Sequence, residues 1–201
     1  MDSLNVQTFT GVIFDLDGTL VESSLDFAFL RQSLNCPDHL DLLAHVDSLD
    51  DHAKAHANAF IEQHELDDAQ HAKWLPGALE LVSAIADLGL PMAIVTRNSP
   101  EAARIKVSNN RIPIQRVLTR ADAPAKPDPT ALLMVAKDWQ QSPETIMYVG
   151  DYKYDLQAAI NAGMHACLYA PAGTPEYADL AHSVYSDYDE LSRYLHKCVT
   201  N

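Results

Sequence analysis

Two aspartates separated by one residue, Asp15 and Asp17, follow a short apolar run near the start of the chain and precede Gly18. The run Val12–Phe14 is β-branched and aromatic, which is typical of a buried strand. In extended backbone, residues two apart point the same way, so both carboxylates can face one small volume. Two carboxylates at such a short distance repel each other unless a cation or a shared proton reduces the repulsion. The pattern therefore indicates a metal-assisted carboxylate nucleophile, although Asp-Gly is also a common surface turn.

Length and charge limit the classes of protein to consider. The chain has 201 residues and a formal net charge of −14, which suits one domain with an insertion or two small domains. The negative charge argues against nucleic acid or an anionic membrane surface as a partner, because phosphates would be repelled. No apolar run is long enough to span a bilayer. We therefore expect no nucleic-acid partner and no membrane partner.

Cysteine usage and the first residues predict the compartment. The three cysteines, Cys36, Cys167 and Cys198, form no CxxC pair, which fits free thiols in a reducing environment. Met1–Thr10 carry neither a basic segment nor an apolar one, so we expect no secretory signal. The expected location is the cytoplasm.

The chain divides into two rhythms. From Val21 to about Trp74 the periodicity is helical, with helices expected after Ser23 or Ser24, from near Asp38, and over about 50–65. From Leu75 onward, helices alternate with apolar runs that read as strands at 92–95, 116–119, 145–149, 165–169 and 183–185.

This alternation predicts an α/β fold, a Rossmann-like three-layer core with a mostly parallel sheet covered on both faces. Residues 1–20 and 75–201 form that core, and residues 21–74 form a small all-helical cap inserted after the first strand. In such sheets a ligand lies outside the carboxyl ends of the strands. That rule gathers distant polar residues at one place: Asp15 and Asp17, Thr96 and Asn98, Lys126, Asp151 and Asp155.

Four stretches, in this order, resemble the motifs of the haloacid dehalogenase superfamily in its phosphatase form. They are Asp15–Thr19, Thr96 after an apolar strand, Lys126 before a proline, and Gly150–Asp155 with two acids. Pro76-Gly77 before an amphipathic helix resembles the return from a helical cap. The resemblance spans nearly the whole chain. By pattern the sequence is most similar to phosphoglycolate phosphatase-like enzymes, although its cap is short for them.

The resemblance implies a Mg²⁺-dependent phosphatase that hydrolyses small phosphomonoesters. Asp15 would be the nucleophile that forms an aspartyl-phosphate, and Asp17 the general acid and then base. Asp15, the backbone carbonyl of Asp17 and Asp151 would bind the metal, with Asp155 holding a ligand water or orienting Lys126. The phosphoryl oxygens would be bound by Thr96, Arg97, Asn98, Lys126 and the backbone N–H of Leu16.

Several alternatives stay open at this point. Dehalogenases of the superfamily lack an acid at the position of Asp17, but sugar phosphomutases share the two-acid motif. A non-catalytic binding protein on the same fold is the other alternative. His52 and His56 have the i, i+4 spacing of a two-histidine metal site, yet an exposed helix surface explains them more simply. The expected partner is a small phosphorylated metabolite, with the chain acting as a monomer or homodimer.

Overall fold

The structure, a computed structural model, describes residues 8–199. The expectation that Met1–Thr10 carry no secretory signal falls mainly on residues 1–7, which lie outside the described residues. A six-stranded sheet has the order β3-β2-β1-β4-β5-β6, and its five strand pairings are all parallel. The strands are β1 (Gly11–Phe14), β2 (Met92–Val95), β3 (Arg116–Leu118), β4 (Ile146–Gly150), β5 (His165–Tyr169) and β6 (Ser183–Tyr185).

Eight α-helices and two 3-10 turns complete the described chain. They are α1 (Phe27–Ser33), α2 (Leu42–Asp47), α3 (Asp51–Ala69), α4 (Ala78–Asp87), α5 (Pro100–Asn109), α6 (Thr130–Trp139), α7 (Lys153–Asn161), α8 (Tyr188–Val199), η1 (Pro143–Thr145) and η2 (Ala178–Leu180). The predicted α/β class with a parallel sheet is confirmed.

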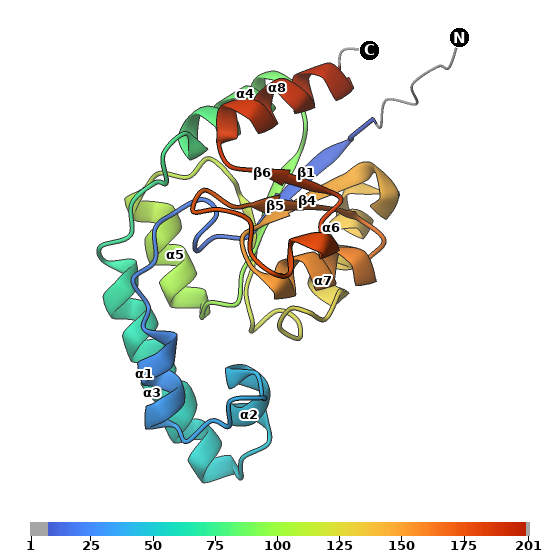
Figure 1. Ribbon diagram of the computed structural model, residues 1–201. Helices are drawn as coiled ribbons and strands as arrows, with labels where there is room; N and C mark the ends of the chain where they lie inside the picture. The colour runs from blue at the N-terminus through green and yellow to red at the C-terminus, as the bar shows by residue number, and fades with distance from the viewer. Residues whose placement is uncertain (1–7, 200–201) are drawn as a thin grey trace.

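Helices cover both faces of the sheet, as Figure 1 shows with α4 and α8 on one side and α6 and α7 on the other. Alternation along β1 explains this. Val12 and Phe14 face a core shared with Leu81 of α4, whereas Ile13 faces a core shared with Leu132 of α6. Because both faces of the central strands are buried, β1, β2 and β4 are apolar throughout rather than alternating.

Local signals in the core led to accurate predictions. Ser99 caps α5, with its Oγ accepting from Ala102 N at 3.3 Å and Pro100 in the first helical position. Asp187 Oδ1 accepts from Glu190 N at 2.8 Å at the start of α8. The strands predicted at 92–95, 165–169 and 183–185 are confirmed without a shift, and the other two differ by one residue at their ends.

Two predicted helix starts between β1 and α4 are wrong. The first helix is capped by Asp26, whose Oδ1 accepts from Phe29 N at 2.9 Å, and not by Ser23 or Ser24. The second begins at Leu42 behind the cap Asp41 instead of near residue 38. In both places an aspartate nearer the helix supplies the capping oxygen. The two serines are engaged elsewhere, as described below.

Helices α1, α2 and α3 form a separate unit, called here the helical insert (residues 27–69). It projects from one end of the molecule in Figure 1. Its own buried cluster includes Leu30, Val46 and Ile61. The segments leading in and out are hydrogen-bonded to each other, Glu22 N to Lys73 O at 2.8 Å and Leu75 N to Leu20 O at 2.9 Å. The insert therefore leaves and rejoins the core at one place.

The turn after β1 depends on Gly18. Its φ is +71°, a left-handed value that side chains disfavour. A Cβ at this position would overlap the carboxyl group of Asp151, which follows β4. The missing side chain therefore lets the β1 turn and the β4 turn approach each other closely.

We expect Gly18→Ala to destabilise the fold more than Gly89→Ala, although both glycines have nearly the same φ. Gly89, at +72°, has open space where a Cβ would be, so its substitution incurs only the left-handed backbone penalty of about 1–2 kcal/mol. Gly18→Ala adds the displacement of Asp151, at a further cost of at least about 1 kcal/mol. Urea unfolding of both variants measures the difference. Equal free energies of unfolding would show that the two turns are not in close contact.

Candidate active site

Three carboxylates meet beyond the carboxyl ends of the two central strands. Asp15 follows β1, Asp151 follows β4, and Asp155 lies in the first turn of α7. One oxygen of each lies within 4.8 Å of one oxygen of both others. Parallel strands end at the same edge of a sheet, so the register of β1 against β4 is sufficient to place Asp15 beside Asp151.

Lys126 is the counter-ion of this cluster. Its Nζ lies 2.8 Å from Asp15 Oδ1 and 2.6 Å from Asp155 Oδ1. It also donates to Tyr148 Oη at 2.7 Å and to the carbonyl of Val95 at 2.9 Å. Its side chain is 2% exposed, so its charge is held by these oxygens and not by water.

Both carboxylate oxygens of Asp155 accept hydrogen bonds, from three partners in all. Its Oδ2 accepts from Tyr152 N at 2.9 Å, as in a helix N-terminus, while its Oδ1 accepts from Lys126 and from Tyr148 Oη at 3.1 Å. Asp155 therefore stabilises the first turn of α7 and orients Lys126 at the same time. Across the site, Asp151 Oδ1 accepts from Thr19 Oγ1 at 3.1 Å.

Two carboxyl groups of the cluster, Asp15 and Asp151, have pKa values well above their ordinary range. Burial, and then the neighbouring carboxylates Asp155 and Asp17, raise the pKa of Asp15 to about 7 against the attraction of Lys126. Burial, followed by Asp155 and Asp15, raises the pKa of Asp151 to about 8. Burial alone would lower the pKa of Lys126, but Asp15 and Asp155 outweigh it and raise that pKa. One ammonium therefore does not balance three carboxylates.

These residues fit a hard divalent cation. The donors of the cluster are all carboxylate oxygens, which Mg²⁺ prefers. Burial first, and then the neighbouring carboxylates, raise the pKa values of Asp15 and Asp151, and a bound cation would favour the ionised form of both. The described residues can thus hold a metal ion.

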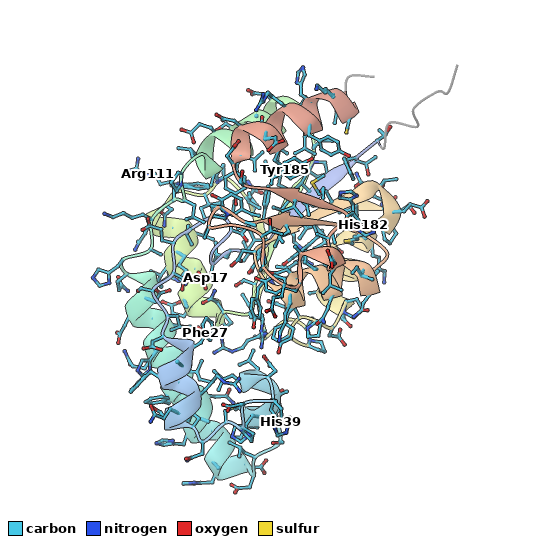
Figure 2. All side chains as sticks on the ribbon, viewed as in Figure 1. Asp17, Phe27, His39, Arg111, His182 and Tyr185 are labelled. Atoms are coloured by element: carbon cyan, nitrogen blue, oxygen red, sulfur yellow. The ribbon has the colours of Figure 1, made fainter. Side chains whose placement is uncertain are left out.

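Asp17 points into the same region but is held by different donors. Its Oδ2 accepts from Asn98 Nδ2 at 2.6 Å and its Oδ1 from Lys106 Nζ at 2.5 Å. Asn98 Nδ2 also donates to Thr96 Oγ1 at 2.9 Å. Figure 2 shows Asp17 on the side of the core that faces the helical insert. The residues after β1 and β2 are thus brought together, as the sequence predicts.

Arg97 extends toward the insert. Its Nη2 donates to both carboxylate oxygens of Asp41, each at 2.7 Å, and its guanidinium lies 4.8 Å from the ring centroid of Tyr154. Leu16 is fully buried in the β1 turn. The predicted phosphate-binding roles of Arg97 and Leu16 stay predictions.

A cavity of about 550 Å³ connects the carboxylates to the insert. Its floor includes Asp15, Asp17 and Thr96, and its lining on the insert side is largely apolar, from Leu25, Phe27, Leu30, Leu42, Leu43 and Ile61. Arg31 of α1 also lines the cavity, while its guanidinium donates to the carbonyls of Pro37 and Leu40.

Sequence reasoning missed the residues that join the insert to the core. Lys106 Nζ also donates to Asp68 Oδ2 at 2.8 Å, and Arg120 pairs with Glu65. Glu65 Oε2 in turn accepts from Ser99 N at 3.0 Å. Each of these residues lies on a helix or loop where a solvated charge is the ordinary expectation. No local sequence signal distinguishes them.

His52 and His56 on α3 do not belong to a larger group of potential metal ligands in the described part of the chain. Among residues 8–199, the group of three or more potential ligands is Asp15, Asp151 and Asp155, and it includes neither His52 nor His56. All three cysteines are free, as predicted, and the structure also buries them.

The fold and site define an α/β protein whose acidic pocket lies at the switch point of a parallel sheet, beneath a helical insert. The chain belongs to the haloacid dehalogenase-like hydrolase family, whose model matches residues 31–169. Hexitol phosphatase A of Escherichia coli is 30% identical over 184 residues, covering 82% of this chain and 85% of that protein. A phosphoglycolate phosphatase of Pseudomonas putida is also 30% identical, covering 76% of this chain and 66% of that protein.

Solved structures agree on the fold. A hydrolase from Pseudomonas syringae aligns with a TM-score of 0.78 at 24% identity, covering 94% of this chain and 98% of that one. A putative phosphoglycolate phosphatase from Lactobacillus plantarum aligns with a TM-score of 0.75 at 19% identity, covering 93% and 99%. In the part of the chain that the structure describes, no helix is both long and apolar enough to cross a lipid bilayer.

We expect Mg²⁺ to raise the melting temperature more at about pH 8 than at about pH 5. The raised pKa values of Asp15 and Asp151 mean that the metal-free folded protein binds more protons than the unfolded chain between about pH 4 and pH 8. These two groups therefore lower the free energy of unfolding as the pH rises through that range. A bound cation replaces the protons and removes the penalty.

Thermal unfolding with Mg²⁺ and with EDTA at the two pH values measures this effect. Asp151→Asn should abolish most of the increment, whereas Asp138→Asn, in an exposed ion pair with Arg116, should retain it. An increment that is the same at both pH values would contradict the assignment of the cluster as a cation site.

We expect Arg97→Met to raise KM and to weaken inhibition by inorganic phosphate, because Arg97 is a predicted phosphate donor. Asp41→Leu removes the carboxylate that Arg97 Nη2 contacts in the structure, so it frees the guanidinium and should leave inhibition by phosphate at least as strong as in the wild type. Steady-state kinetics with phosphate as inhibitor measure both variants. Equal weakening of inhibition in the two variants would show that Arg97 only pairs with Asp41 and does not bind the phosphoryl group.

Proposed function

We propose that the chain is a Mg²⁺-dependent phosphatase that hydrolyses small phosphomonoesters through an aspartyl-phosphate on Asp15. The supporting observation is the placement of Asp15, whose Oδ1 lies 2.8 Å from the buried ammonium of Lys126 and one of whose carboxylate oxygens lies within 4.8 Å of an oxygen of Asp151 and of Asp155. Asp17 lines the same cavity. A carboxylate nucleophile with a second acid beside it is what a two-step phosphoryl transfer requires.

In the first step, an oxygen of Asp15 attacks phosphorus, and the bond between phosphorus and the ester oxygen breaks. Asp17 gives its proton to the departing oxygen, so that an alcohol leaves. In the second step, Asp17 takes a proton from water as the water attacks the same phosphorus. The bond to Asp15 then breaks and inorganic phosphate is released.

Other residues bind and orient the phosphoryl group. Lys126 favours the ionised form of Asp15 and offers positive charge to a phosphoryl oxygen. The other proposed hydrogen-bond donors to the phosphoryl oxygens are Thr96, Asn98, Arg97 and the backbone N–H of Leu16. Asp15, the backbone carbonyl of Asp17 and Asp151 would hold Mg²⁺, with Asp155 holding a ligand water or orienting Lys126, and the bound ion would supply charge neutralisation to the transferring group.

In this proposal residues 21–74, which include the helical insert, form a cap over the site. Residues 1–20 and 75–201 form the catalytic core. Its apolar lining excludes water from the reacting groups. A cavity of about 550 Å³ admits a metabolite-sized ester and rejects a folded phosphoprotein. We further propose a cytoplasmic location, in keeping with free buried thiols.

The names of the relatives indicate which esters to test. Phosphoglycolate and hexitol phosphates are substrates named for matched proteins, and the largely apolar lining on the insert side favours adding alkyl phosphates with no charge other than the phosphate. A putative β-phosphoglucomutase from Thermotoga maritima also shares the fold, with a TM-score of 0.69 at 18% identity. A phosphomutase is therefore the second candidate.

We expect phosphate release from at least one such ester with Mg²⁺, and a loss of at least about 10³-fold in kcat for Asp15→Asn, because the amide is not a nucleophile. EDTA should abolish release, and Mg²⁺ should restore it. A colorimetric phosphate assay with wild type, Asp15→Asn and Asp138→Asn, in the exposed pair noted above, makes the comparison.

Two other outcomes would change the function. Isomerisation of a sugar phosphate without release of phosphate would identify a mutase. No turnover of any ester, with equal ligand binding by wild type and Asp15→Asn, would favour a non-catalytic binding protein.

A further inference from the structure

One lysine joins the proposed acid–base residue to the helical insert. Lys106 lies on α5, a core helix, and its side chain is 0% exposed. Its Nζ donates to Asp17 Oδ1 at 2.5 Å and to Asp68 Oδ2 at 2.8 Å. Asp68 lies at the end of α3, where the insert returns to the core. A single buried ammonium is thus shared by a carboxylate of the site and a carboxylate of the insert.

Asp68 also holds the segment that leads into the insert. Its Oδ1 accepts from Ser24 N at 2.7 Å and from Ser24 Oγ at 2.9 Å, and its Oδ2 from Ser23 Oγ at 3.0 Å. These are the serines that do not cap α1. Both connections between core and insert therefore converge on Asp68, and through Asp68 on Lys106.

Asp17 is oriented by the same ammonium. Lys106 holds one carboxylate oxygen and Asn98 holds the other, at 2.6 Å. Donors on two different oxygens fix the plane of the carboxyl group as well as its position. The side chain of Asp17 is nevertheless 24% exposed and lines the cavity, so the restrained group still faces the space where an ester would bind.

We propose that Lys106 is a positioning residue that aims the carboxyl group of Asp17 at the leaving oxygen and ties that aim to the docked position of the insert. The inference rests on the proposed phosphatase function. When the insert is docked, Asp68 fixes Lys106, and Lys106 fixes Asp17. Because the ammonium is fully buried, water does not replace it when it is removed.

The test uses two esters that differ in how much they need a proton donor. An alkyl phosphate expels a strongly basic alkoxide and requires protonation, whereas p-nitrophenyl phosphate expels a stable phenolate and requires little. The value of kcat/KM reports the steps up to departure of the leaving group. A misaimed Asp17 therefore affects the alkyl ester selectively, and a generally damaged site affects both.

We expect Lys106→Met to lower kcat/KM for the alkyl ester about 10- to 100-fold and for p-nitrophenyl phosphate less than about threefold. Asp68→Asn removes the carboxylate of the insert that fixes Lys106, so it should raise KM for both esters and also cause a selective loss on the alkyl ester that is smaller than that of Lys106→Met. Arg104→Met is the matched control, since Arg104 lies on α5 in an exposed ion pair with Glu101.

A second variant covers the chance that Lys106→Met does not fold. The double variant Lys106→Met/Asp68→Asn removes the buried charge that Lys106→Met leaves without a counter-ion. It should recover thermal stability while keeping the selective loss on the alkyl ester.

The possible results distinguish failure of the inference about Lys106 from failure of the proposed phosphatase function. Equal losses on both esters would show that Lys106 only holds the fold together, and no loss on either would show that Asp17 needs no aid; each result overturns the inference. If the wild type hydrolysed neither ester, the phosphatase proposal would fail first. Hydrolysis by the wild type with a selective loss in the variants supports both.

Discussion

The structure depends on the burial of one ammonium among carboxylates that the sheet brings together. Parallel strands β1 and β4 end side by side, so Asp15 and Asp151 cannot be separated without changing the sheet. Lys126 lies within 2.6–2.9 Å of four oxygens at this edge. Its charge offsets part of the repulsion, and the remaining excess of negative charge is what makes the site receptive to a cation and to the chemistry that a cation supports.

The same electrostatic principle holds the helical insert. Three cations of the core, Arg97, Lys106 and Arg120, pair with three acids in or just before the helices of the insert, Asp41, Asp68 and Glu65. In each case removal of the cation leaves the acid at least partly buried without a counter-ion. The insert is therefore docked by matched charges around an apolar cavity, and the strong net negative charge of the chain does not prevent local pairing.

The sequence predicts the features that depend on local residue patterns, but not the contacts that arise only from tertiary packing. Asp15, Asp17, Thr96, Lys126 and Asp151 follow strands, and strand ends converge by a general rule, so their meeting could be foreseen. Lys106 could not, because a lysine in a weakly amphipathic helix looks solvated until α3 covers it. Ser23 and Ser24 were misassigned as caps for a related reason: an acid 44 or 45 residues away competes for them.

The paired segments on either side of the insert have a consequence for how the chain can vary. Leu20 and Leu75 are hydrogen-bonded neighbours although more than fifty residues separate them, so the core is already closed before the insert begins. Lengthening, shortening or replacing the insert leaves the register of the sheet unchanged, because loop length between fixed ends has only a weak effect on stability. The proposed catalytic residues of the core and the cavity lining on the insert can therefore change at different rates during evolution.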